Sequence, residues 1–368
     1  MQSLNQTLEH QALNTSTFNT QTLKQRWQAL LEKQPATRIR EAAALLSVSE
    51  MELLASDMPD KVVQLQGDFK VLMDRLTQVG NVMSLVRNGI AVHELSGHYP
   101  ALRFNRNPQV GIAMDAIDLR IHFNDYCYAF AVHDPSAKHP LRSIQFFDKS
   151  GQALQKIYLK NQIHTALWDD IVLHFKAVKQ TSIFTLVDVK KWNRSFVDIN
   201  IPSFKKAWEL MRDIHDLSKI IKRFSISRHE AVSMIGEPFA WRVHTKAINH
   251  LMHQICEQKL SCFVFVGNKG VTQIYSGAFI KTKEMGAWAN VLDPNFNLHV
   301  LTTAVKDVWV VKKPTKHGVV TSLEVYDENG KISLQFAPVD TRTKEETAEW
   351  RALFESLPKI ESAKELTQ

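Results

Sequence analysis

The sequence predicts an α+β protein in which helices followed by an antiparallel sheet occur twice in tandem. At 368 residues the chain is long enough for two domains. Apolar alternation around a turn that contains Asp and Gly is typical of a β-hairpin, and it occurs at residues 144–158 and again at residues 323–336. Runs of helices followed by runs of strands favour an α+β fold over a doubly wound sheet.

Aligning the two hairpins at their turns fixes the offset between the copies. Asp148 falls on Asp327, which gives 327 − 148 = 179 residues. At this offset the strand pattern of residues 116–123 falls on residues 295–302. A fixed offset over long segments indicates a duplicated structural unit.

The remaining elements also repeat in the same order in each half. Each half has an amphipathic helix with a tryptophan, a helix opened by a Ser-x-x-Glu capping box, a glycine-bounded strand segment and a closing helix with a second tryptophan. The matching pairs are Trp27 with Trp208, residues 49–52 with 227–230, residues 87–97 with 267–277, and Trp168 with Trp350.

The offset also divides the chain into segments. The expected order is a flexible N-terminal tail at 1–22, a first repeat at 23–180, a linker at 181–202, a second repeat at 203–358 and a C-terminal tail at 359–368.

Composition narrows the classes of protein. No run approaches 18 apolar residues, which predicts no membrane span, and the polar N-terminus lacks the apolar region of a signal peptide. Cys127, Cys256 and Cys262 form neither a CxxC pair nor a metal framework, which is typical of a reducing compartment. The formal charge is +7, but Lys and Arg are scattered, which favours a solvated surface over a nucleic-acid site.

His215 lies where the two halves differ, in a segment (205–224) that we expect to be one amphipathic helix. On such a helix Trp208, Met211 and His215 would share a face. An imidazole among apolar side chains suits an iron ligand, with its other nitrogen free for a second partner. From the residues alone, a core histidine with a satisfied hydrogen bond stays open beside the iron ligand.

Other histidines and one arginine lie on expected strands. Alternation in residues 118–123 puts Arg120 and His122 on one strand face, where they could meet a carboxylate or an iron-bound group, or simply face solvent. The residues alone favour an edge or surface position for His93. His250 and His253 have the spacing of a helical metal pair, but no acidic third ligand is near, so we interpret them as surface residues.

Familiar catalytic and nucleotide-binding motifs are absent. HExxH, G-x-S-x-G, a P-loop and G-x-G-x-x-G do not occur, and residues 267–270 are interpreted as a turn between strands. Residues 43–56 have the rhythm of a helix-turn-helix, but the second helix opens with Glu50 and Glu52, which would repel phosphate. The sequence therefore does not favour DNA binding.

Several segments resemble the bacterial cytoplasmic haem-utilisation proteins of the haemin-degrading HemS/ChuS type. The resemblance covers residues 23–358, and its most specific segments are WELMRDIHDLSKIIKR, RNGIAVHE, AIDLRIHFN, RSIQFFDKSG, LDPNFNLH and KKPTKHG. It implies a tandem α+β fold with haem between the halves.

The resemblance also implies roles for particular residues. It implies His215 as the proximal iron ligand and Arg120 as the distal arginine. Near the propionates it implies Arg228 and Lys313 as cations and Gln335 as a polar contact, and it implies His93 as a second haem-associated histidine.

This sequence departs from the family pattern at three positions. His122 stands where the family usually has a phenylalanine. Ala337 and Asp340 stand where the family has a Tyr and an Arg that contact the propionates, and Arg342 is close enough in sequence to substitute. His122 could hydrogen-bond a ligand of the iron or bind the iron itself.

Two functions are compatible with such a site. The first is oxygenase-type cleavage of imported haem with release of iron, which needs an electron donor such as a reductase or NAD(P)H, with Arg120 and His122 near the reacting centre. The second is a non-catalytic haem chaperone that takes haem from an importer and passes it to an acceptor. A site with both His215 and His122 on the iron would favour the chaperone.

Overall fold

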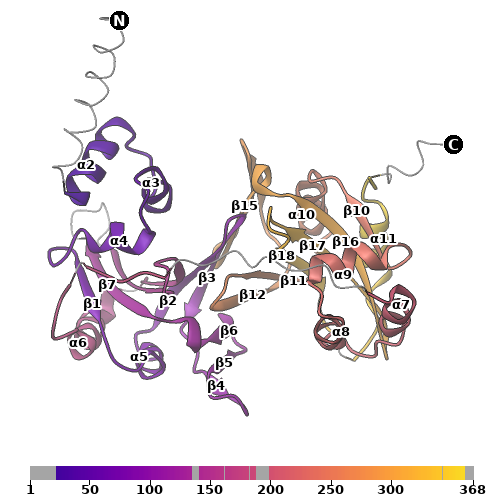
Figure 1. The fold of residues 1–368 in the computed structure, drawn as a ribbon, viewed down its shortest axis with the longest axis horizontal. Coiled ribbons are helices and arrows are strands. Elements are labelled where there is room, and N and C mark those ends of the chain that lie inside the picture. Colours follow the sequence, from indigo (N-terminus) through magenta and orange to yellow (C-terminus); the bar gives the residue numbers. More distant parts are fainter. Residues whose placement is uncertain are drawn as a thin grey trace, which may run out of the picture.

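The computed structural model describes residues 22–134, 141–160, 162–181, 183–187, 199–341 and 343–360. These residues form two nine-stranded antiparallel sheets with helices packed on them (Figure 1). The predicted α+β class and the tandem repeat are confirmed. Most of the expected N-terminal tail, the centre of the expected linker and residues 361–368 lie outside the described residues.

The first half of the chain contributes five α-helices and nine strands within the described residues. The helices are α2 (Leu23–Lys33), α3 (Ile39–Leu45), α4 (Glu50–Ala55), α5 (Phe69–Leu76) and α6 (Thr165–Phe175). The strands are β1 (Val62–Leu65), β2 (Asn81–Arg87), β3 (Ala91–His98), β4 (Arg103–Phe104), β5 (Val110–Ala113), β6 (Asp118–His122), β7 (Tyr128–Asp134), β8 (Leu141–Phe147) and β9 (Ala153–Leu159).

The second half repeats this order over its own described residues. Its helices are α7 (Ile201–Glu209), α8 (Asp216–Phe224), α9 (Arg228–Ile235), α10 (Ala247–Glu257) and α11 (Ala348–Glu355). Its strands are β10 (Ala240–Val243), β11 (Cys262–Gly267), β12 (Val271–Gly277), β13 (Thr282–Met285), β14 (Trp288–Leu292), β15 (Phe296–Leu301), β16 (Asp307–Thr315), β17 (Gly318–Tyr326) and β18 (Ile332–Pro338).

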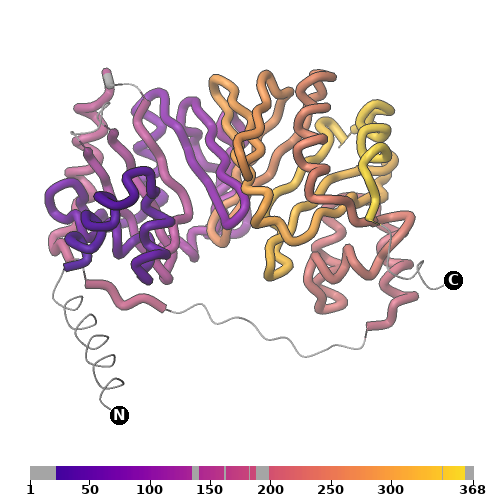
Figure 2. The backbone as a smooth tube through the Cα atoms, turned by 90° about the horizontal axis from the view of Figure 1, so that it is seen from above, coloured from indigo at the N-terminus to yellow at the C-terminus, as the bar shows by residue number. Residues whose placement is uncertain are grey.

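The two halves exchange strands. The first sheet has the order β1-β7-β8-β9-β2-β3-β15-β14-β13, and the second sheet has the order β10-β16-β17-β18-β11-β12-β6-β5-β4. Strands β13 to β15 of the second half thus complete the first sheet, and β4 to β6 of the first half complete the second sheet. Figure 2 shows the orange strands of the second half lying beside the purple strands of the first. The boundaries expected from the offset stay a prediction.

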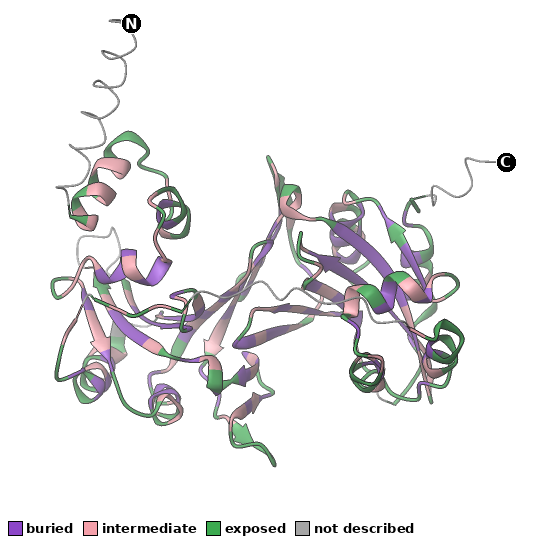
Figure 3. Cartoon of the chain, in the orientation of Figure 1, coloured by how far each residue is buried: buried purple, intermediate pink, exposed green. Residues whose placement is uncertain are grey.

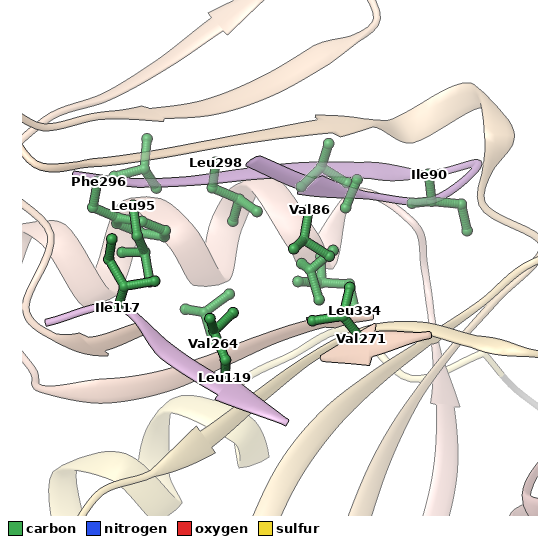
Figure 4. Close-up of a cluster of buried hydrophobic side chains, with 14 of the residues drawn as sticks. Val86, Ile90, Leu95, Ile117, Leu119, Val264, Val271, Phe296, Leu298 and Leu334 are labelled. Carbon is green, nitrogen blue, oxygen red and sulfur yellow. The ribbon is translucent and has the colours of Figure 1, made fainter. Parts of the chain in front are cut away.

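One hydrophobic core joins the halves. Val86, Leu95, Val264 and Leu334 are at most 3% exposed and belong to the same cluster of contacting side chains. Figure 4 shows such residues from β2, β3, β6, β11 and β15 converging between the two sheets. The strands are largely buried, whereas α2, α3 and α8 have broad exposed faces (Figure 3). Because the core spans both halves, the faces that remain for a ligand are those turned toward the helices.

Local signals in the sequence behave as expected. The Ser49 and Ser227 hydroxyls each accept a hydrogen bond from the backbone N–H of the third helical residue. The carboxylates of those residues, Glu52 and Glu230, accept a hydrogen bond from the backbone N–H of the capping serine. In the first hairpin the Asp148 carboxylate accepts from two backbone N–H groups of the turn, and Gly151 adopts a φ of +76° that favours glycine.

The predicted single helix over residues 205–224 is wrong. α7 ends at Glu209 and α8 begins at Asp216. Between them the Asp216 carboxylate accepts from the backbone N–H groups of Arg212 and Asp213, both at 3.1 Å, and the Asp213 carboxylate accepts from that of His215 at 2.8 Å. These local bonds satisfy backbone groups that a continuous helix would pair internally.

Candidate functional site

Most of the residues implied for the site lie on one face of the second sheet. Directly opposite residues on paired antiparallel strands point to the same face, as do residues two apart on one strand. The pairs that carry this face across the sheet are Arg120–Thr272, Thr272–Gly267, Phe265–Gln335, Gln335–Glu324 and Glu324–Trp309. We call it the site face. It carries Arg120, Gln335 and Lys313.

Helices α7, α8 and α9 cover one end of the site face. Trp208, Met211 and Leu217 pack in one hydrophobic cluster with Trp309 and with other side chains of β16 and β17. In Figure 1, α8 lies below the strands of the second sheet, and β4 to β6 form the far end of that sheet, beyond β11 and β12. The helices therefore lie over the β16 end of the site face, and the exchanged strands β4 to β6 form its other end.

His215 lies at the N-cap of α8 and its side chain is exposed. It does not share a helix face with Trp208 and Met211, because the helix is interrupted before it; those two side chains are buried. The interruption is anchored to the β16–β17 turn, where the Lys316 backbone N–H donates to the Arg212 carbonyl at 2.9 Å. His215 therefore projects from a junction fixed to the end of β16.

Arg228, Lys313 and Gln335 come together around Glu324, a residue that the sequence reasoning missed. Glu324 is fully buried and accepts two hydrogen bonds from the Arg228 guanidinium, at 2.9 and 2.7 Å, and one from the Lys313 ammonium at 2.6 Å. Arg228 also donates to the Gln335 side-chain oxygen at 3.3 Å. The signal in the sequence is a lone carboxylate inside the apolar run of β17.

The charges in this cluster perturb one another. Burial alone would raise the pKa of Glu324, but Arg228 and Lys313 outweigh that effect and hold it well below its ordinary value. Burial lowers the pKa of the Lys313 ammonium to about 8, although Glu324 opposes this. Two cations against one carboxylate leave the cluster one positive charge in excess, which favours an anionic group beside it.

Arg120 and His122 point to the site face as predicted. The intervening Leu119 and Ile121 are fully buried, whereas Arg120 is half-buried and His122 is exposed. The Arg120 guanidinium pairs with the Asp118 carboxylate and donates to the carbonyls of Ala113 at 2.7 Å and Leu119 at 2.9 Å. These bonds fix the orientation of its remaining donors.

A hollow borders this end of the site face. It has a volume of about 610 Å³ and is lined by Asn105, Arg106, Asn107, Val110 and Ile112. Val110 lies opposite His122 and Ile112 opposite Arg120 in the β5–β6 pair, so these four side chains share a face. A hollow of this size falls in the range of about 300–1,000 Å³ that is usual for small-molecule sites.

The floor between the two ends is aromatic. Phe263 and Phe265 are half-buried neighbours on the site face, with ring centroids 5.8 Å apart. The sequence reasoning missed them as well, although the alternation of CFVFVG predicts two phenylalanines on one face. Ala337 lies opposite Phe263, so no large side chain stands there.

His93 is not the edge or surface residue that its sequence context suggested. It lies on β3 as expected but is fully buried between the sheets, with its ring 5.0 Å from that of Phe296. Burial lowers the pKa of His93 to about 3. Gln273 lies 3.0 Å from Nδ1, and the Val264 backbone also acts on the buried ring. Its role at a ligand site stays a prediction.

The remaining expectations have a defined outcome. Asp340 is exposed and pairs with Lys344 at 3.4 Å, while Arg342 lies outside the described residues.

Across the ranges that the structure covers, no group of three or more His, Cys, Asp or Glu side chains is placed to hold a metal ion. In the same ranges, every helix is too short or too polar to cross a bilayer.

The side chains of the site face and His215 at the N-cap of α8 together include the groups that a flat apolar ring with an iron and two carboxylates needs. Such a ligand needs an axial donor, an apolar slot and cations at its rim. His215 offers an imidazole, the Phe263–Phe265 floor is apolar, and Arg228 with Lys313 supplies the excess charge. A bidentate guanidinium is suited to carboxylates because it is planar and permanently charged.

Comparison with known proteins gives consistent matches. The family model described as the haemin-degrading HemS.ChuX domain matches residues 47–175 and again residues 225–357. The haemin transport protein HmuS of Yersinia pestis is 30% identical over 317 residues, which cover 86% of this chain and 92% of HmuS.

Solved structures agree over nearly the whole chain. The haem-binding protein PhuS of Pseudomonas aeruginosa, in its holo form, superimposes with a TM-score of 0.87 and 33% identity over 92% of this chain and 99% of PhuS. The haem-degrading enzyme ChuS of Escherichia coli O157:H7 superimposes with a TM-score of 0.82 and 29% identity over 91% of this chain and 98% of ChuS.

Proposed function

This chain belongs to the family of proteins with the haemin-degrading HemS.ChuX domain, and from that premise we propose that it binds haem in iron acquisition and degrades it to release iron. The observation that carries the proposal is the site face, where Arg120, Gln335 and the Arg228–Lys313–Glu324 cluster lie on one side of a single sheet. PhuS is described as haem-binding and ChuS as haem-degrading, which supports both parts of the proposal.

The chain's own residues would hold and orient the ligand. His215 would bind the iron through a ring nitrogen, since its ring is exposed at the N-cap of α8. Arg228 and Lys313 would hold a propionate, and Gln335 would accept or donate a hydrogen bond beside it. Phe263 and Phe265 would exclude water from one edge of the ring.

Arg120 would offer hydrogen-bond donors to the bound ligand. Its bonds to Asp118 and to the Ala113 and Leu119 carbonyls hold the guanidinium in place, so its remaining N–H groups are pre-oriented donors. Bound haem supplies the redox-active iron and the ring carbon that is oxidised, while the protein supplies binding and orientation.

A haem chaperone is the second candidate, and one observation favours it. His122 is exposed at the end of β6 on the same face as Arg120. If its imidazole bound the iron as well as His215, the protein would hold the iron through two residues, and the site would store haem and not oxidise it. We place either activity in the cytoplasm, with a haem importer upstream and, for the enzyme, a reductase or NAD(P)H as the electron donor.

Spectroscopy of the purified protein with hemin tests the proposal. A degrading enzyme should form a Soret band on mixing and lose it in air only after an electron donor is added, with release of iron. A chaperone should keep the band under the same conditions. If no specific complex forms at all, haem binding is wrong.

Replacing His122 by Phe separates the two candidates. We expect His122→Phe to raise turnover, because a side chain that could bind the iron is removed and the phenyl ring would exclude water. The readouts are the rate of Soret loss with reductant in air and the spin state of the ferric complex. His133→Phe, a change of an exposed histidine on β7, is the matched control. Unchanged turnover and spin state in His122→Phe would end the idea that His122 matters.

A further inference from the structure

Two asparagines join the halves of the molecule at equivalent positions. Asn88 lies in the turn between β2 and β3, and Asn268 lies in the turn between β11 and β12. Their separation is 268 − 88 = 180 residues, the offset at which residues 87–97 match residues 267–277. Both side chains are half-buried, and each bonds partly to its own half and partly to the other.

The amide oxygen of each asparagine closes its own turn. Oδ1 of Asn88 accepts from the backbone N–H groups of the residues two and three positions ahead, both at 2.9 Å. Oδ1 of Asn268 accepts from the equivalent pair of N–H groups, at 3.0 and 3.2 Å. Because two donors face each oxygen, the orientation of each amide is fixed and its Nδ2 group points away from its own turn.

The Nδ2 group of Asn88 joins two strands of the second half. It donates to the carbonyl oxygen of Gly267 on β11 at 2.9 Å and to that of Ser333 on β18 at 2.7 Å. The two strands pair through Phe265 and Gln335, which lie two residues before Gly267 and two residues after Ser333. Both of these side chains belong to the site face. A residue of the first half therefore holds together the ends of two strands that carry the site face.

The Nδ2 group of Asn268 makes the equivalent bonds to the first half. It donates to the carbonyl oxygen of Arg87 on β2 at 3.1 Å and to that of Leu154 on β9 at 2.7 Å. The Arg87 guanidinium and the Lys156 ammonium of β9 both pair with the Glu50 carboxylate. The arrangement is thus reciprocal, and in this half too the joined strands carry a charge cluster.

A buried polar contact between the halves continues from the two turns. The amide nitrogen of Gln273 on β12 donates to the carbonyl oxygens of Ser84 and His93, both at 3.0 Å, and its oxygen accepts from the Ser84 hydroxyl at 2.7 Å. All three residues are fully buried. His93 occupies the repeat position of Gln273, because 273 − 93 = 180, and the Val264 backbone acts on its ring. Since buried polar groups are costly to leave unpaired, these bonds oppose independent movement of the two turns.

We propose that Asn88 and Asn268 are reciprocal positioning residues, each of which holds the strands that carry the charge cluster of the other half. For the site face, Asn88 of the first half sets the positions of Phe265 and Gln335. This consequence for ligand binding rests on the proposed function. An asparagine with a purely local role would bond only within its own turn, whereas both N–H groups of each amide here bond to the other half.

Hydrogen exchange in the ligand-free protein tests the reciprocal arrangement. Asn88→Asp keeps the oxygen that closes the turn but replaces the two donated bonds by repulsion between a carboxylate and two carbonyls. We expect Asn88→Asp to speed amide exchange in β11 and β18 at least about fivefold, and Asn268→Asp to speed it in β2 and β9 instead. Exchange that rose mainly in the half that carries the substitution would overturn the proposal.

Hemin binding tests the consequence for the site face. We expect Asn88→Asp to weaken by about fivefold the part of hemin binding that His215→Ala removes, and to shift the Soret band of that part. Asn268→Asp, with matched bonds in the other half, should leave this part within about twofold of the wild type. Equal losses in the two variants would mean general loosening and would contradict a positioning role of Asn88. A wild type that binds no hemin would refute the proposed function, while the exchange pattern would still decide the reciprocal arrangement.

A milder variant keeps the test decisive if Asn88→Asp does not fold. The hydroxyl of Asn88→Ser can accept within the turn and donate one bond to the other half. We expect the same pattern of faster exchange in β11 and β18 with a smaller amplitude. A folded Asn88→Ser protein with wild-type exchange in both strands would exclude the role of Asn88.

Discussion

At the scale of single residues, the chain combines a buried ion cluster with an exposed imidazole. Glu324 is fully buried, yet Arg228 and Lys313 keep it ionised, and the three side chains together carry one excess positive charge. His215 is held outside the hydrophobic core by the Asp213 and Asp216 caps. If haem binds as proposed, the His215 imidazole would hold its iron and the ion cluster would hold its carboxylates.

Lys313 should make ligand binding depend on pH. Burial lowers the pKa of its ammonium to about 8, so in the free protein it is charged below that pH and neutral above it. A bound carboxylate raises this pKa, and binding at higher pH must then take up a proton. We expect hemin affinity to fall as the pH rises from about 7 to about 9, by at most about tenfold per pH unit.

Hemin titrations at several pH values check this expectation. Lys313→Met keeps the length of the side chain without a titratable group and should weaken binding while flattening the profile. A profile in Lys313→Met that is as steep as that of the wild type would assign the pH dependence to another group.

At the scale of elements, caps and hairpins could be predicted from the sequence, whereas the end of α7 could not. A capping box or an Asp-Gly turn depends on a few neighbouring residues, and both copies formed as expected. The apolar pattern of residues 205–224 continues through the break, so periodicity alone predicts one helix. Asp213 and Asp216 could have predicted the end of the helix, because Asp side chains accept hydrogen bonds from backbone N–H groups that a continuous helix would pair internally.

The second capping box provides a test of element stability. Ser227→Ala removes the side-chain acceptor at the start of α9 and should lower the free energy of unfolding by about 1 kcal/mol. Ser218→Ala, an exposed substitution within α8, should stay within about 0.5 kcal/mol of the wild type. Urea unfolding of the two variants compares them. Equal stabilities would mean that the cap does not stabilise α9.

At the scale of the whole molecule, the duplication was visible in the sequence but the strand exchange was not. The fixed offset placed β6 on β15 correctly, since local patterns repeat. Which sheet each strand joins depends on contacts between residues far apart in sequence, such as Arg120 with Thr272, and no local pattern encodes them. The site face is complete only because of this exchange, so its Arg120 end could not be located from either half alone.

The contact between the halves is tight enough to test. A Cβ added at Gly270 would meet the Leu154 side chain at 2.7 Å and the Tyr126 ring at 3.2 Å, both in the shared core. We expect Gly270→Ala to destabilise the protein by about 1–3 kcal/mol. Gly89→Ala, where the nearest atom is 3.9 Å away, should be close to neutral. Thermal unfolding of both variants would reveal a loosely packed interface if neither lost stability.

The most direct test of the account is a hemin titration of His215→Ala beside His250→Ala. The account predicts that His215→Ala weakens hemin binding to the second half at least about tenfold and changes the spin state of the ferric complex, because the iron loses its axial donor. His250→Ala should behave as the wild type. A His215→Ala protein that kept the wild-type Soret band and affinity would contradict the central claim that this imidazole holds the iron.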